Sequence, residues 1–109
     1  MVCQEYRDAA IGALRLSERA AKNQTLLKEI DRKIETACLD MIRVGISDAV
    51  VYAENPNPLI TEAVATFCQA KMGREDKRND YMDAYIYQIE AMRKSAKLQE
   101  GNLKHESNE

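Results

Sequence analysis

The clearest hydrophobic pattern in the chain lies between Leu26 and Ile42. Apolar residues recur there at spacings of three and four, namely Leu26, Leu27, Ile30, Ile34, Ala37, Cys38, Met41 and Ile42. The opposite face is charged and carries Lys28, Asp31, Arg32, Glu35 and Arg43. This pattern predicts an amphipathic helix. Asn23-Gln24-Thr25 offers an N-cap for it, and Gly45 is placed to end it.

The pair Asn57-Pro58 predicts the start of another helix, because asparagine favours the N-cap and proline fits the first helical position. This helix should end at Gly73, with the glycine in the left-handed conformation. Its apolar stripe is predicted to comprise Ile60, Ala63, Val64, Phe67, Cys68 and Met72.

Two further helices, one at each end of the chain, have weaker patterns. The first runs from Cys3 to about Ala21, with Tyr6, Ala10, Ala13, Leu14 and Ser17 on one face. Gly12 weakens it by about 1 kcal/mol relative to alanine. The last runs from about Arg78 to Leu98, with Tyr81, Tyr85, Ile89, Met92 and Ala96 on one face.

Residues 45–57 lack a helical period, and Pro56 and Pro58 restrict the residues before them, so a loop is expected. It either has a function of its own or packs as a short extended segment. The elements together predict an all-α fold, a small bundle of about four helices with a long loop between the second and third main helices. Residues 1–98 form this single helical domain, and residues 99–109 are a polar tail expected to be disordered.

Composition and charge narrow the possible functions. The chain has 109 residues, which fits one domain, and a formal net charge of −2. Acidic and basic residues are interspersed, so the basic surface typical of nucleic-acid or membrane-surface binding is not expected. No stretch approaches the roughly 20 apolar residues of a membrane span, and the first turns are charged rather than apolar as in a signal peptide. A cytosolic protein is expected.

Few residues of the sequence could act in catalysis or bind a metal. Cys3, Cys38 and Cys68 are far apart in the sequence and form no CxxC pair, so reduced and mostly buried thiols are expected. The only histidine, His105, lies in the polar tail. A second histidine that could activate a cysteine or complete a zinc site is absent from the sequence. We therefore expect no enzyme activity, no catalytic residues, no cofactor, no metal site and no small-molecule substrate.

Several apolar residues have no evident partner within a lone bundle. Ile11 and Leu16 lie off the stripe of the first helix, Val50-Val51-Tyr52 falls in the predicted loop, and Tyr87 lies on a different face from Tyr81 and Tyr85. The candidate subunit or partner interface therefore comprises Ile11, Leu16, Val50, Val51, Tyr52 and Tyr87.

Three blocks of the sequence resemble the phage head-tail connector family, the head-completion adaptors between portal and tail. The first begins at Glu29-Ile30, continues through Ile34, Ala37 and Asp40, and ends at Gly45-Ile46. The second is Asn57-Pro58-Leu59-Ile60, then Ala63-Val64, then Phe67 to Gly73. The third is Tyr85, at the spacing of a tyrosine in the family's last helix. Many family members instead begin with a short lysine-containing helix, so the segment from Cys3 to Ala21 departs from the pattern.

The resemblance implies a structural protein of phage or prophage virions, without a cofactor. Copies would form a homo-oligomeric ring, dodecameric by resemblance, beneath the portal protein. The ring would extend the DNA channel, with DNA only as cargo, and dock a neck or tail completion protein. The protein would be found in the host bacterial cytoplasm during assembly and then at the head-tail junction of the virion. A ring needs two different patches on each subunit.

Two other interpretations stay open. A small helical adaptor or regulator could form a dimer and bind a partner helix in a groove. The other is a small enzyme that uses Cys38 or Cys68, although both cysteines lie on predicted apolar stripes.

Overall fold

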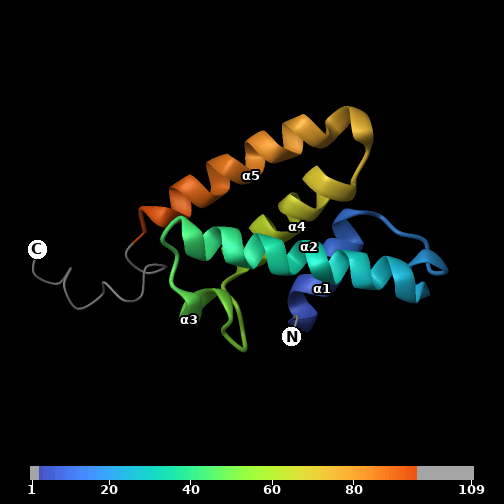
Figure 1. The fold of residues 1–109 in the computed structure, drawn as a ribbon, viewed down its shortest axis with the longest axis horizontal. Helices are drawn as coiled ribbons and strands as arrows, with labels where there is room; N and C mark the ends of the chain where they lie inside the picture. The colour runs from blue at the N-terminus through green and yellow to red at the C-terminus, as the bar shows by residue number, and fades with distance from the viewer. Residues whose placement is uncertain (1–2, 96–109) are drawn as a thin grey trace, which may run out of the picture.

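The computed structural model describes residues 3–95, and the regular secondary structure of this part of the chain is all helical, without strands. The α-helices are α1 (Gln4–Ala13), α2 (Gln24–Arg43), α3 (Asp48–Val51), α4 (Pro58–Met72) and α5 (Arg78–Arg93), with 3-10 turns at Ala20–Lys22 and Glu75–Lys77 (Figure 1). The all-α prediction is confirmed for these residues. The predicted continuation of the last helix is wrong at Lys94 and Ser95, which lie after the end of α5. Residues 96–98 and the predicted tail, residues 99–109, lie outside the described part.

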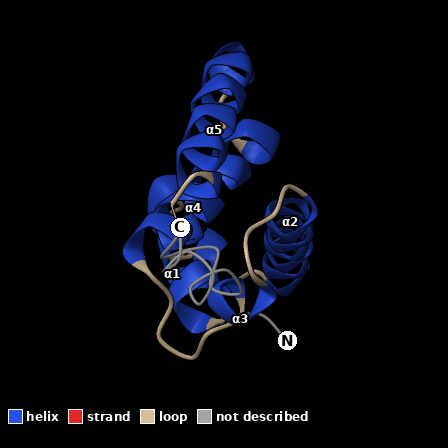
Figure 2. Cartoon of the chain, turned by 90° about the vertical axis from the view of Figure 1, so that its left-hand side faces the viewer, coloured by secondary structure: helices blue, strands red, loops and turns tan. Residues whose placement is uncertain are grey.

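The central helix is α4, which contacts α1, α2 and α5. Figure 2 shows α1, α4 and α5 stacked in one column, with α2 to one side. Six consecutive residues of α4, from Ala63 to Cys68, are buried. The predicted apolar stripe is therefore too narrow, because a helix with neighbours on several sides buries residues around its whole circumference.

The first helix ends at Ala13, eight residues before the predicted end at Ala21. Arg15 adopts a left-handed conformation with φ 55°. Its N–H bonds to Gly12 O at 3.1 Å and the Leu16 N–H bonds to Ile11 O at 3.4 Å, which is the Schellman pattern of a helix end. The prediction failed because the residue that ends the helix is an arginine, and glycine is the usual signal for this conformation.

Both predicted ends of the second helix are confirmed. The side chain of Asn23 accepts a hydrogen bond from the Leu26 N–H at 2.9 Å. At the other end Gly45 has φ 112°, and the Ile46 N–H bonds to Met41 O at 3.0 Å. Ile46 is thereby turned into the core, where it is buried. The glycine is needed here because side-chain-bearing residues rarely adopt this φ.

The segment predicted to be a loop contains the short helix α3. Ser47 caps it by accepting a hydrogen bond from the Ala49 N–H at 3.2 Å. Residues 48–51 of the segment are therefore helical, whereas residues 52–57 form a loop. Four residues are too few to display a helical period, which is why the sequence pattern did not reveal the helix.

The start of α4 was predicted correctly, whereas the conformation at its end was not. Asn57 Oδ1 accepts a hydrogen bond from the Leu59 N–H at 2.8 Å, and Pro58 occupies the first turn. Gly73 has φ −80° and ψ −162°, so it is extended and not left-handed. A Cβ atom at Gly73 would lie 2.5 Å from Gln69 O, so the glycine is required for a close backbone approach.

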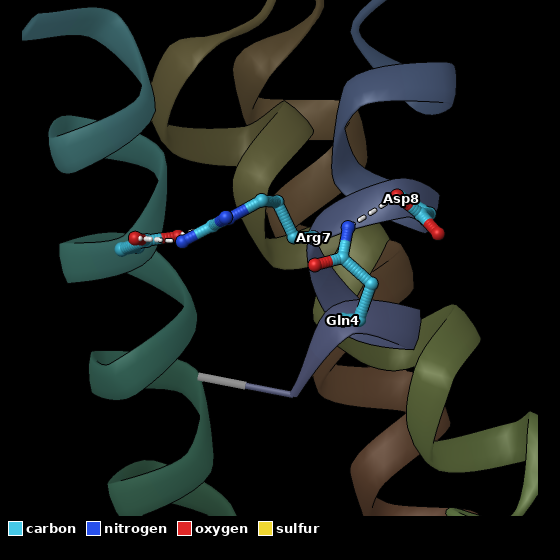
Figure 3. A network of polar contacts seen from close by, with 4 residues as sticks. Gln4, Arg7 and Asp8 are labelled. Carbon is cyan, nitrogen blue, oxygen red and sulfur yellow. Dashed lines mark hydrogen bonds and ion pairs between the residues drawn. The ribbon is translucent and has the colours of Figure 1, made fainter. Parts of the chain in front are cut away.

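The N-terminal helix is attached to its neighbours by polar contacts. Arg7 reaches from α1 to α2, where both Nε and Nη2 donate to the carboxylate of Asp31 (Figure 3). On α1 itself, Gln4 Nε2 donates to Asp8 Oδ1 at 2.8 Å. The hydroxyl of Tyr6 donates to Val51 O in α3, and Gln69 Nε2 in α4 donates to Ala13 O at 3.2 Å. These bonds hold α1 against three different helices.

Candidate functional site

The six predicted interface residues have different surroundings in the folded chain. Ile11, Leu16 and Val50 are partly buried and pack against the core. Tyr52 and Tyr87 are exposed, with 47% and 76% of their surface accessible. Val51 is completely buried, so the prediction that it contributes to an exposed interface is wrong.

The short helix α3 explains the burial of Val51. This single turn begins at Asp48 and brings its last residue, Val51, to the first turn of α1, where Tyr6 donates its hydroxyl hydrogen to Val51 O. Both side chains belong to the hydrophobic core. Burial raises the pKa of the Tyr6 hydroxyl, so it stays protonated and remains a hydrogen-bond donor at neutral pH.

A first apolar surface lies where the start of α4 meets α5. Its most exposed side chains are Leu59, with 57% of its surface accessible, and Tyr87. They flank a hollow of about 220 Å³ that Ala91 and Met92 also line, and Glu62 lies at its edge. We call this surface the Leu59–Tyr87 patch. Contiguous exposed apolar surface of this kind marks contact sites in soluble proteins.

A second apolar surface lies between α2 and α5, each of which packs against α4. The groove has a volume of about 520 Å³. Its apolar lining consists of Val44 at the C-cap of α2, Phe67 from α4, and Met82, Tyr85, Ile86 and Ile89 from α5. We call it the α2–α5 groove. Leu39, 57% exposed, lies on α2 three residues from Thr36 and four from Arg43, both of which line the groove, so it shares their side of the helix.

One polar contact joins α2 and α5 at this groove. The hydroxyl of Tyr85 donates to Asp40 Oδ2 at 2.8 Å, while Arg43 Nη2 donates to Asp40 Oδ1 at 2.7 Å. The Tyr85 ring is buried and meets Phe67 edge-on, with 5.0 Å between ring centroids. Burial, together with the hydrogen bond to Asp40, raises the pKa of Tyr85. The tyrosine is therefore held neutral as a donor to the carboxylate.

The residues that carry the family resemblance have distinct structural roles. Asn57 caps α4, Pro58 begins it, and Ile60 is fully buried. Phe67 and Tyr85 form the edge-on pair, and Gly73 allows the close approach to Gln69 O. Pro58 is exposed, and so is Leu59, a large apolar side chain with 57% of its surface accessible. Leu59 therefore belongs to the surface and not to the core.

A third hollow, of about 320 Å³, contains two of the three cysteines. Cys3, Tyr6, Cys38 and Tyr52 line it, with Glu35 and Glu54 among its polar residues. Burial raises the pKa of Cys38 to about 12 and also raises that of Cys3. A protonated thiol is a poor nucleophile and a poor metal ligand. Within residues 3–95, no group of three or more His, Cys, Asp or Glu side chains could hold a metal ion.

The exposed residues Leu39, Leu59 and Ile86 were not among the predicted interface residues. Leu39 has Glu35, Thr36 and Arg43 at helical spacings of three and four, and these mostly polar neighbours are the signal that could have identified it. Ile86 has the apolar residues Met82 and Ile89 at these spacings, so its exposure could not be predicted from the pattern. Leu59 gave no such signal, because the residue after a proline in the first helical turn can face either way. The α2–α5 groove could not be predicted at all, since it depends on how two helices diverge from α4.

Comparisons of the chain with protein-family models, with curated proteins and with solved structures found no match. No helix among the described residues is both long enough and apolar enough to span a membrane.

Proposed function

We propose that this chain is a structural head-tail connector of a phage or prophage, which forms a homo-oligomeric ring beneath the portal protein. The ring extends the DNA channel and docks the next neck or tail component. The protein acts by assembly and catalyses no reaction. It works in the host cytoplasm while virions form and then at the virion's head-tail junction.

The observation that carries the proposal is that the three blocks of family resemblance meet at one place. Asp40 belongs to the first block, Phe67 to the second and Tyr85 to the third. Tyr85 donates to Asp40 at 2.8 Å and packs edge-on against Phe67. Residues that are widely separated in the sequence thus form a single, partly buried contact, as expected if the three blocks jointly specify one fold.

The exposed apolar surfaces also support assembly. The Leu59–Tyr87 patch and the α2–α5 groove are different surfaces, and α5 contributes to both. A closed ring needs two different patches on each subunit, because each copy contacts the next through unlike surfaces.

The proposal is tested by recruitment to the portal. A portal protein from the genome that encodes this chain is purified, mixed with the full chain and imaged by electron microscopy. The expected result is a ring of this chain stacked coaxially on the portal. A portal that stays bare when the chain is in excess would contradict the proposal.

The groove favours one alternative, a dimeric adaptor or regulator that binds an amphipathic helix of a partner protein. A hydrophobic groove between two helices is a common receptor for such a helix. This alternative predicts an isologous dimer, in which the same patch of both copies is used, whereas the connector predicts contacts between unlike patches.

A further inference from the structure

We propose that the Leu59–Tyr87 patch of one copy docks into the α2–α5 groove of the next copy. This inference rests on the proposed function and specifies the subunit contact that the ring would use. The occupant of the groove is therefore a second copy of this same chain.

The two surfaces face different directions, which is required if each subunit of a ring contacts one neighbour through each surface. Ile86 lines the groove and Tyr87 lines the patch, and neighbouring residues on a helix point about 100° apart. On α4, Lys71 lies at the groove and Glu62 at the patch. Nine residues separate them, which is two and a half turns at about 3.6 residues per turn, so they lie on opposite sides of the helix.

The apolar parts of the two surfaces are complementary, because one has projecting side chains and the other has a hollow. The patch projects Tyr87 and Leu59, which are 76% and 57% exposed. The groove offers a hollow of about 520 Å³ with Ile86, 47% exposed, at its edge. An aromatic side chain that enters an apolar hollow is the usual anchor of a protein interface.

The charges beside these surfaces are complementary. Glu62 makes no side-chain ion pair or hydrogen bond with any of residues 3–95, and Lys71 is not paired with a carboxylate in the same part of the chain. The Lys71 ammonium lies 5.5 Å from the centre of the Phe67 ring, at the floor of the groove. The other charged residues of the groove, Asp40, Arg43 and Glu90, already have partners within their own helices. Glu62 of the incoming copy is thus placed to pair with Lys71.

Two variants of the full chain test this contact. The patch variant carries Leu59→Glu and Tyr87→Glu, and the groove variant carries Lys71→Glu and Ile86→Glu. We expect the unmodified chain to self-associate in sedimentation velocity across a concentration series, and each variant to remain monomeric with unchanged circular dichroism. Mixed in equal amounts, the two variants should form a heterodimer that does not grow. The intact groove of one can accept the intact patch of the other, whereas the remaining two surfaces both carry added glutamates and repel each other.

Matched charge reversals provide the control. Glu18 and Lys28 are exposed and lie on neither surface, so Glu18→Lys and Lys28→Glu should assemble like the unmodified chain. Loss of assembly in these controls, persistent assembly of either test variant, or a mixture that stays monomeric would overturn the inference. If the unmodified chain is monomeric throughout but still forms a ring on the portal, the proposed contact is wrong and the connector function stands. A two-fold dimer of the unmodified chain would contradict both.

Discussion

Val50 and Val51 are neighbours in sequence but differ in burial. Val51 is completely buried at the end of α3, whereas Val50 is partly exposed. Val51→Asp would place an unpaired charge in the core, so we expect it to lower the free energy of unfolding by about 3 kcal/mol or more. Val50→Asp should lower it by about 1 kcal/mol. Urea denaturation followed by circular dichroism measures both, and equal effects of the two substitutions would contradict the position of α3.

Arg15 is the residue at which α1 ends in a left-handed turn. A side chain in this conformation is disfavoured by about 1 kcal/mol relative to glycine. Arg15→Gly should therefore raise the free energy of unfolding by about 0.5 to 1 kcal/mol, and Arg15→Ala should not, because alanine keeps the Cβ atom. Thermal denaturation of the two variants tests this expectation. Destabilisation by glycine would mean that α1 continues beyond Ala13.

Because two cysteine thiols are buried, we expect the free energy of unfolding to fall in mild base. Burial raises the pKa of Cys38 and Cys68 to about 12 each, whereas an unfolded cysteine has a pKa of about 8.5. The unfolded chain loses these protons first as pH rises. Their stabilising contribution is therefore complete below about pH 8.5 and decreases as pH rises toward 12.

Between about pH 8 and pH 9.5 the expected loss is about 1 kcal/mol per thiol, because each pKa unit corresponds to about 1.4 kcal/mol. The urea midpoint in the presence of a reductant is measured at both pH values. The double variant Cys38→Ala, Cys68→Ala should show a smaller change between them. Identical slopes for the two proteins would contradict the burial of the thiols.

At the scale of elements, one hydrogen bond links α2 to α5. Tyr85→Phe removes the donor to Asp40, so we expect the free energy of unfolding to fall by about 1.5 to 3 kcal/mol, the usual range for a hydrogen bond to a charged group. Tyr87→Phe is the control, because Tyr87 is 76% exposed. It should leave stability within about 0.5 kcal/mol of the unmodified chain. Equal effects of the two substitutions in urea denaturation would contradict the linking role of Tyr85.

The elements whose ends carry strong local signals were predicted well from the sequence. Asn23, Gly45 and Asn57 act as the caps that their residue types suggest. The end of α1 was missed because an arginine adopts the left-handed conformation there. Helix α3 was missed because a four-residue helix has no periodicity, and with it the burial of Val51. In both cases the conformation of the segment depends on its packing in the fold and has no signal in the local sequence.

At the scale of the whole molecule, the exposure of some candidate interface residues could be predicted from the sequence. The exposure of Tyr52 and Tyr87 was predicted correctly, because each lies off an apolar stripe or outside a periodic segment. The α2–α5 groove depends on two helices that meet α4 at different places, so no local pattern could have identified it. The proposed contact therefore combines a residue found by sequence, Tyr87, with a surface visible only in the fold.

The central claim is that the chain assembles through unlike surfaces into a closed ring. Light scattering of the purified chain across a concentration series, with electron microscopy of the species larger than a dimer, tests this claim most directly. The account predicts a mass that rises with concentration to a fixed multiple of the monomer, and circular particles with a central channel. A two-fold dimer at every concentration would contradict it, and so would a monomer that forms no ring on the portal either.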